Sequence, residues 1–231
     1  MKFTTLLQNI LSIFYPRSCV SCRDALQQHE KLLCTNCLLH LPETNYHLDK
    51  ENPLQLLFRG RVPIENIAAL LFYKKGNQVQ HILHALKYNG NQEIGEFLGH
   101  YYGLQLSKED NYQQIDLILP IPLHPKKLKN RGYNQSECIA KGLSRSMAIP
   151  YRTDILIRTI FTETQTKKSR FNRWKNVEQV FKVVEEDEIV GKHLLLCDDV
   201  LTTGATLEAA INKTLDAGAS HISIVTLAVA H

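Results

Sequence analysis

The sequence lacks the long apolar runs that membrane-spanning proteins need. No segment reaches about 18 consecutive apolar residues, so we expect no part of the chain to insert into a bilayer. The first segment, Lys2 to Phe14, is interrupted by Gln8, Asn9 and Ser12, and no A-x-A cleavage site follows it. This pattern predicts a short amphipathic helix rather than a signal peptide, with binding to a membrane surface as the alternative. A cytoplasmic protein is therefore expected.

A strong charge of one sign is also missing. The formal net charge is only +4, which argues against a dedicated nucleic-acid coat. The positive charge is nevertheless concentrated in two clusters, at residues 126–131 and 167–175. Each cluster is either a solvated face or a site for polyanions such as phosphate, pyrophosphate or nucleic acid.

Internal repeats and low-complexity stretches are absent from the 231 residues. The chain is 44% hydrophobic and 22% charged, as in ordinary globular proteins. Its length suits one large domain or a small module with a core domain. We expect the second arrangement, with a small module at residues 1–45 and the main domain at residues 46–231.

Four of the six cysteines form two C-x-x-C pairs. Cys19 and Cys22 are separated by 11 residues from Cys34 and Cys37. Two residues between thiolates let a tight turn aim both sulfurs at one ion, so the pairs predict a tetrahedral Zn²⁺ site. Because protein ligands fill all four positions, zinc there would be structural rather than catalytic. A disulfide pair or a redox motif is the competing interpretation, but the sequence shows neither an exported nor a thioredoxin-like setting.

The rest of the chain alternates between strand and helix patterns. Strands are predicted at residues 67–73, 115–120, 151–158, 179–184, 193–197 and 221–229. Helices are predicted at residues 79–86, 94–104, 136–147 and 206–217. Residues 159–176 are basic, polar and poor in aliphatic side chains, which predicts a long loop. The alternation predicts an α/β fold with a mostly parallel central sheet flanked by helices.

One strand leads directly into a segment rich in phosphate-binding features. The run Leu194–Leu196 has no polar face, which is typical of a central parallel strand, and it is followed by Asp198 and Asp199. These carboxylates should emerge at the carboxyl edge of the sheet, where open α/β folds bind ligands. Thr202, Thr203, Gly204, Ala205 and Thr206 come next and lead into a helix.

This loop is suited to an anion. Gly204 lets the backbone approach a ligand closely, and the free N–H groups of the first helical turn favour negative charge. The threonines add hydroxyl donors, while the two carboxylates can accept from sugar hydroxyls or bind a metal ion. A chance turn would explain an isolated T-T-G, but not the whole string between a strand and a helix.

The string resembles the phosphoribosyl diphosphate (PRPP) motif of type I phosphoribosyltransferases. That resemblance implies a type I phosphoribosyltransferase-like fold. It also implies that Asp198 and Asp199 contact the ribose hydroxyls and that residues 202–206 bind the 5-phosphate of PRPP or ribose 5-phosphate. Mg²⁺ is expected to accompany PRPP.

Further motifs resemble the ComF family of competence proteins along nearly the whole chain. They are the paired cysteines, Leu86-Lys87-Tyr88, residues 119–125, Arg131-Gly132-Tyr133-Asn134-Gln135, and the pattern Arg158, Gln165, Arg173, Asn176 and Phe181. Lys168 before Ser169 is a small departure that affects only local loop packing. The resemblance implies that Pro122, Leu123 and His124 form the pyrophosphate loop, that residues 159–176 form a hood, and that Arg173 neutralises the leaving group.

Two function classes follow from these observations. The protein is either a phosphoribosyltransferase, for which no convincing general base is visible, or a binding module for PRPP or single-stranded DNA that performs no turnover. The ComF resemblance implies a role in DNA uptake, or in catabolism of external DNA, with a competence helicase as a possible partner. The sequence leaves the acceptor and the oligomeric state open.

Overall fold

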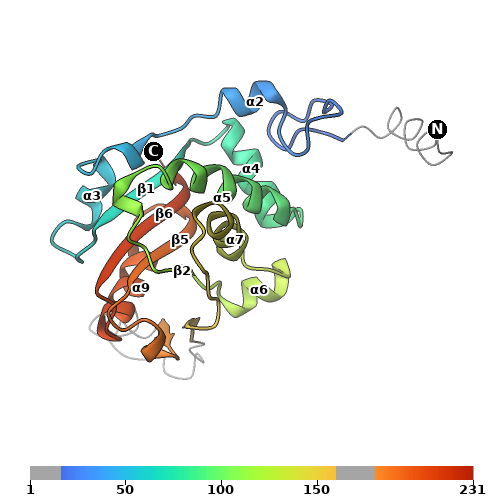
Figure 1. Ribbon diagram of the computed structural model, residues 1–231. Coiled ribbons are helices and arrows are strands. Elements are labelled where there is room, and N and C mark those ends of the chain that lie inside the picture. Colours follow the sequence, from blue (N-terminus) through green and yellow to red (C-terminus); the bar gives the residue numbers. More distant parts are fainter. Residues whose placement is uncertain (1–16, 160–179, 231) are drawn as a thin grey trace.

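The computed structural model describes residues 17–159 and 180–230. Its centre is a four-stranded sheet with the strand order β1 (Asn66–Tyr73), β6 (His221–Ala230), β5 (His193–Leu201) and β2 (Leu117–Pro120). Each neighbouring pair is parallel, and Figure 1 shows the strands side by side. The predicted parallel α/β architecture is therefore confirmed.

The apolar run of β5 serves two cores at once. Successive side chains of a strand point to opposite faces. Leu195 and Cys197 therefore join one core, whereas Leu194 and Leu196 join the other. All four side chains are buried, which explains why this strand reads as continuously apolar instead of alternating.

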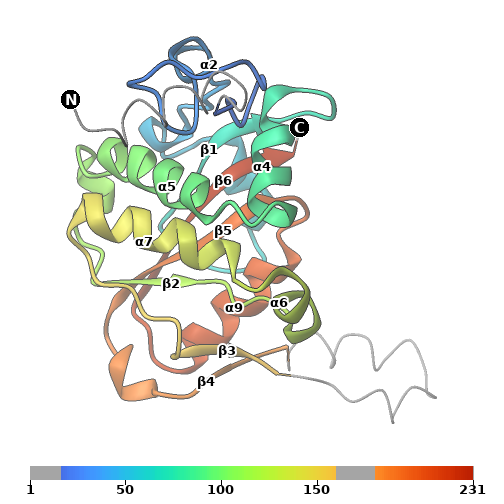
Figure 2. The same ribbon diagram turned by 90° about the vertical axis from the view of Figure 1, so that its right-hand side faces the viewer.

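Helices cover both faces of the sheet. On one side lie α4 (Gln78–Tyr88), α5 (Gln92–Leu106) and α7 (Gln135–Met147). On the other side lie α3 (Pro53–Phe58) and α9 (Ala205–Asp216). Figure 2 views the molecule from the right-hand side of Figure 1 and shows α5 and α7 in front of the strands. This layering leaves the two ends of the strands as the places where a ligand can reach the sheet.

Two glycines let α5 and α7 approach each other closely. A Cβ atom on Gly99 would lie 2.3 Å from the carbonyl oxygen of Ile139, and one on Gly142 would lie 2.2 Å from that of Glu96. Neither contact leaves room for a methyl group. Small residues at both positions therefore set the distance between these helices.

A separate two-stranded antiparallel hairpin is formed by β3 (Leu156–Arg158) and β4 (Phe181–Val183). The strand predicted at residues 151–158 is thus shorter than expected, although Tyr151 makes an isolated bridge to Ile118 of β2. The predicted hood, residues 159–176, lies outside the described residues except for Thr159. The predicted amino-terminal helix also lies outside them.

Several short helices were not predicted. The structure adds α2 (Thr35–Leu39), α3 and α6 (Pro125–Arg131). Short 3-10 turns occur at Tyr46–Leu48, Asp110–Tyr112 and Glu186–Glu188. In α6, His124 caps the first turn, proline follows at the first helical position, and Gly132 ends the helix with a φ of 79°. These are ordinary start and stop signals, but α6 buries no side chain and so has no apolar periodicity.

The cysteine-containing segment packs onto the main body. Leu33, Cys37 and Leu41 share a buried core with Val79 and Ile82 of α4. The boundary at residue 45 remains a prediction. Within the described ranges, no helix has the length and apolar character needed to cross a bilayer.

Candidate functional site

The acidic pair lies at the carboxyl edge of the sheet, in the last part of β5. The Asp198 Oδ1 atom accepts hydrogen bonds from the Ser136 hydroxyl and from the Asp199 backbone N–H, each at 2.8 Å. Burial raises the pKa of Asp198 to about 7, and the neighbouring Asp199 charge adds to the increase. The hydrogen bonds and the Lys87 charge oppose this shift. Asp198 is therefore poised to change protonation near neutral pH.

A lysine from α4 neutralises the second carboxylate. Lys87 Nζ lies 2.9 Å from Asp199 Oδ2, and both side chains are mostly buried, with 23% and 16% of their surface exposed. Lys87 lies in the last turn of α4, and the C-terminal end of this helix lies beside the end of β5. The motif Leu86-Lys87-Tyr88 thus contributes directly to the acidic pair.

The segment between α6 and α7 joins the site from the other side. Asn134 caps α7 through the Ser136 N–H, and its Nδ2 atom donates to the Ile121 carbonyl at 3.0 Å. The Tyr133 hydroxyl donates to the Leu86 carbonyl, so this ring packs against the body. Together these bonds fix Ser136 beside Asp198 and link two motifs that are far apart in sequence.

The threonine-rich loop turns sharply after β5. Thr202, Thr203, Ala205 and Thr206 are exposed, whereas Gly204 is buried with a φ of 77°. Ala205 N–H makes only a long 3.5 Å contact with the Thr203 hydroxyl. In the described part of the chain, no hydrogen bond uses the N–H groups of Thr203, Gly204 or Thr206. The first turn of α9 therefore presents free backbone donors to an anion.

The underside of this loop is held by α3 and the turn that follows it. A Cβ on Gly204 would lie 2.8 Å from the Phe58 ring, so only glycine fits here without displacing that buried ring. Arg61 Nη1 donates to the Leu57 carbonyl at 2.9 Å and to the Thr203 carbonyl at 3.4 Å, while its other nitrogen pairs with Glu208. Arg61 could not be predicted from the sequence, because its contacts with Thr203 and Glu208 join residues more than 140 positions apart and leave no local signal.

The predicted pyrophosphate loop runs close to the acidic pair. Ile121 N–H donates to the Cys197 carbonyl at 2.9 Å, and Pro122, Leu123 and His124 follow with partly exposed side chains. His124 Nδ1 accepts from the Lys126 N–H at 3.2 Å and so caps α6. The loop therefore leaves β2 beside the end of β5 and leads into the basic helix.

An arginine from the hairpin also approaches the site. Arg158, at the end of β3, stacks over the Phe181 ring with its Cζ atom 5.3 Å from the ring centroid. Burial lowers the pKa of Arg158, and the Asp198 charge opposes that shift. Arg173 lies outside the described residues, so Arg158 is the hairpin cation that the structure brings toward the acidic pair.

The four paired cysteines meet as their spacing predicts. Their sulfur atoms lie within 4.8 Å of one another, and all four are free thiols. Backbone N–H groups of Cys34 and Cys37 point at the sulfurs of Cys19 and Cys34 at 3.3 and 3.4 Å. Burial favours the neutral thiol of Cys19, but the backbone donors outweigh it and lower its pKa to about 7. The cluster can therefore hold a metal such as zinc.

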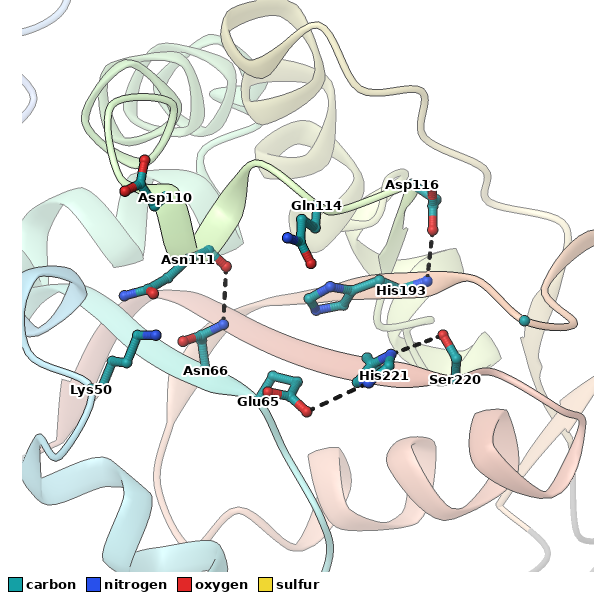
Figure 3. Close-up of a pocket in the computed structure, with 11 residues that line it drawn as sticks. Lys50, Glu65, Asn66, Asp110, Asn111, Gln114, Asp116, His193, Ser220 and His221 are labelled. Carbon is teal, nitrogen blue, oxygen red and sulfur yellow. Dashed lines mark hydrogen bonds and ion pairs between the residues drawn. The ribbon is translucent and has the colours of Figure 1, made fainter.

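A larger polar cavity opens at the opposite edge of the sheet. It measures about 680 Å³, and Figure 3 shows Asn66, His193 and His221 around it at the starts of β1, β5 and β6. His193 Nε2 hydrogen-bonds the Ser223 hydroxyl at 2.9 Å, and burial lowers the pKa of His193. This cavity contains none of the acidic-pair or loop residues, and its place at the amino ends of the strands separates it from the site described above.

Comparison with known proteins gives a domain match and several relatives. Residues 135–231 match the phosphoribosyl transferase domain family. The chain is 27% identical to DNA utilization protein YhgH of Escherichia coli (strain K12), over 89% of this chain and 87% of the relative. It is 26% identical to Competence protein F of Haemophilus influenzae, over 93% and 98%. It is 27% identical to Competence protein ComFC of Bacillus subtilis, over 90% and 82%.

Solved structures show a more distant likeness. Glutamine phosphoribosylpyrophosphate amidotransferase from B. subtilis superposes on 58% of this chain and 26% of its own, with 20% identity and a TM-score of 0.42. A similarity at that level decides nothing about a ligand.

Proposed function

From the match of residues 135–231 to the phosphoribosyl transferase domain family, we propose that the protein binds PRPP at the carboxyl edge of its sheet. One observation carries the proposal: two carboxylates at the end of β5 adjoin an exposed loop with free backbone donors. A sugar phosphate needs both features, since its hydroxyls donate to carboxylates and its phosphate accepts from amides.

The 5-phosphate is assigned to residues 202–206. The N–H groups of Thr203, Gly204 and Thr206 supply neutral donors, and the dipole of α9 adds positive potential. The exposed threonine hydroxyls can donate as well. Gly204 would let the phosphate lie close to the backbone, and Phe58 and Arg61 would hold the loop in that shape.

The ribose is assigned to Asp198 and Asp199. Asp199 keeps Lys87 as a counter-ion, and Asp198 keeps the Ser136 hydroxyl as a donor. These contacts pre-orient both carboxylates, which lowers the cost of arranging them around a sugar. The pyrophosphate is assigned to Pro122, Leu123 and His124, with Mg²⁺ as its expected counter-ion and Arg158 and Arg173 as candidate cations.

Calorimetric titration with PRPP and Mg²⁺ tests this assignment. We expect Asp199→Asn to weaken binding at least tenfold, because it removes a charged acceptor from a mostly buried position. Asp216→Asn is the matched control, since Asp216 is exposed and, among the described residues, pairs with Lys213 on α9. Equal affinities for the wild type and Asp199→Asn would reject the assignment.

The cysteine cluster is proposed to bind a structural zinc ion. Four thiolates complete a tetrahedral site and leave no position for a reacting water. The segment around the cluster is short and buries few apolar residues of its own, so metal ligation would supply much of its folding free energy.

Turnover separates the two function classes. Release of pyrophosphate from PRPP in the presence of an acceptor would make the protein a phosphoribosyltransferase. Binding of PRPP without release would make it a PRPP-responsive binding module. Both outcomes agree with the site, because the residues described here bind and orient a phosphoribosyl group.

The names of the relatives support a role in handling DNA. They are called competence and DNA utilization proteins, and we extend that role to this chain. The competence helicase implied by the sequence resemblance stays a prediction. A second candidate function, single-stranded DNA binding, is favoured by α6, whose lysines are exposed and whose seven residues bury nothing. DNA binding that weakens with salt and survives Asp199→Asn would support it.

A further inference from the structure

The polar cavity at the amino edge of the sheet lies over three buried polar side chains. They are Asn66 of β1, Ser223 of β6 and His193 of β5, and at most 9% of each is exposed. Asn66 Nδ2 donates to the Ser223 hydroxyl oxygen at 3.2 Å, and His193 Nε2 lies 2.9 Å from the same oxygen. Burying polar groups costs free energy unless each is hydrogen-bonded, so the bonds of this buried group decide what the cavity can bind.

The hydrogen-bond network assigns the proton of the His193 ring. The Ser223 oxygen already accepts from Asn66, and the described part of the chain offers its hydroxyl no acceptor other than His193 Nε2. Ser223 therefore donates to Nε2. Burial and the neighbouring His221 charge lower the pKa of His193, which keeps the ring neutral at neutral pH. A neutral ring that accepts at Nε2 carries its hydrogen on Nδ1, so Nδ1 is a donor.

Two atoms of the buried group have no partner among the described residues: His193 Nδ1 and Asn66 Oδ1. Asn66 uses its nitrogen for both of its bonds, to Ser223 and to the Asn111 carbonyl at 3.0 Å, and a carbonyl can only accept. Neither unpartnered atom is fully enclosed by protein. Figure 3 shows both side chains reaching from their strands into the space ringed by the other lining residues. The cavity therefore presents one buried donor and one buried acceptor.

The charged groups around the cavity are all exposed. One cation and three carboxylates border it: Lys50, Glu65, Asp110 and Asp116. Their opposite signs partly cancel and solvent screens them, so they select a charged ligand only weakly. The exposed amide of Gln114 can both donate and accept. The buried donor and acceptor lie in lower dielectric, where an unmade hydrogen bond costs more, and they have the larger part in choosing the ligand.

We propose that this cavity binds a neutral polyhydroxylated molecule, a sugar. A hydroxyl group donates and accepts through one oxygen, so sugar hydroxyls can accept from His193 Nδ1 and donate to Asn66 Oδ1. The polar groups around the opening would bind the outer hydroxyls. The volume of about 680 Å³ lies within the range of about 300–1,000 Å³ that is usual for small-molecule sites. The proposal is independent of the proposed PRPP site, which lies at the other edge of the sheet.

NMR titration of the full chain with D-ribose, D-glucose and adenosine tests the proposal, and the panel separates a free sugar from the sugar of a nucleoside. We expect at least one of them to bind with millimolar or tighter affinity. His193→Phe keeps a ring but removes the donor, and it should weaken binding about three- to tenfold. Ser220→Trp, on the exposed border of the cavity, should fill it and abolish binding. Leu39→Trp places the same ring on the exposed end of α2 and is the distant control.

Each other outcome overturns the proposal. If none of the three probes binds the wild type, or if Ser220→Trp binds them as well as the wild type does, the cavity is not a sugar site. If Asp199→Asn abolishes the binding instead, the sugar occupies the carboxyl edge. If spermidine binds at the cavity and the sugars do not, the carboxylates choose the ligand and a neutral one is wrong. PRPP is absent from these titrations, so a failure of the proposed function, measured separately by calorimetry, leaves their result unchanged.

Discussion

Asp198 lies at the end of the buried strand β5, and burial there raises its pKa into the neutral range. Its pKa of about 7 means that the ionised fraction grows as the pH rises from 6 to 8. An ionised carboxylate is the stronger acceptor for ribose hydroxyls. We therefore expect PRPP affinity to rise by up to about tenfold over this interval, measured by calorimetry at each pH.

The ligand's own phosphates also titrate in this range, so a variant must isolate the protein's part. Asp198→Asn cannot ionise, and the pH dependence that remains in it belongs to the ligand and to other groups. A smaller slope in this variant than in the wild type supports the assignment of ribose to Asp198. An unchanged slope would contradict it.

Arg61 offers a second test at the scale of one residue. It contacts the proposed phosphate-binding loop, residues 202–206, through the Thr203 carbonyl, and it pairs with Glu208 of α9. Within the described ranges, no hydrogen bond or ion pair joins it to Asp198 or Asp199. Arg61→Ala should weaken PRPP and ribose 5-phosphate by about three- to tenfold, because the loop loses a hydrogen-bonded support. Mg²⁺-pyrophosphate, which lacks the 5-phosphate, should bind as before.

Arg59→Ala is the matched control for this experiment. Arg59 is an arginine in the same turn, and its ion pair with Glu51 at 3.2 Å is largely exposed. Its loss should leave all three affinities unchanged, as exposed pairs contribute little. If Arg61→Ala weakens pyrophosphate as much as PRPP, the variant acts through general destabilisation and the positioning role is wrong.

The residues predicted from sequence differ from those missed in one physical respect. Asp198, Gly204 and the threonines were found because strand, turn and helix start are neighbours in the chain, so the pattern is local. The contacts of Ser136 with Asp198 and of Arg61 with Thr203 join segments 62 and 142 residues apart. No spacing in a single sequence encodes such pairs, and only the folded sheet brings them together.

Among the elements, the pair α5 and α7 depends most on small residues. Gly142→Ala should lower the free energy of unfolding by about 1–3 kcal/mol, because the new methyl group meets the Glu96 carbonyl and the α5 backbone. Chemical denaturation measures this change. Ser144→Ala on the same helix, at a partly exposed position, should cost nothing measurable. If the Gly142→Ala protein is as stable as the wild type, α5 and α7 can move apart at little cost and the prediction is wrong.

The long strands were easier to predict than the short helices because burial leaves a visible apolar pattern in the sequence. The strands β1, β5 and β6 are buried on both faces, so their apolar runs stand out in the sequence. Helix α6 has no apolar face at all, and its lysine-rich sequence reads as a loop despite Pro125 and Gly132. The hairpin strands β3 and β4 are three residues each, too short for a period to be recognised.

At the scale of the whole molecule, α4 connects the cysteine cluster to the proposed phosphoribosyl site. The Ser21 carbonyl bonds His81 Nδ1 at 2.7 Å near the start of this helix, and Lys87 reaches Asp199 from its end. We expect Cys19→Ser to lose bound zinc, to lower the melting temperature and to weaken PRPP binding several-fold. Metal analysis, thermal unfolding and calorimetry measure the three effects.

Cys138→Ala provides the matched control, because Cys138 is a buried free thiol outside the cluster. The Cys138→Ala protein should keep its full metal content, even if the cavity left by the shorter side chain lowers the free energy of unfolding. A Cys19→Ser protein with undiminished zinc would contradict the metal site. If the variant loses zinc but keeps its PRPP affinity, the connection through α4 is contradicted and the metal site is not.

The strand order also has a consequence for synthesis on the ribosome. β1 is made early, but its sheet partner β6 is the last of the strands that the structure describes, and β6 lies between β1 and β5. During translation the apolar β1 must therefore wait, without its neighbour, until nearly 150 further residues have emerged. Throughout that interval the nascent chain exposes an unpaired apolar strand that can aggregate. We therefore expect chaperones to protect the chain mainly during this stage of synthesis.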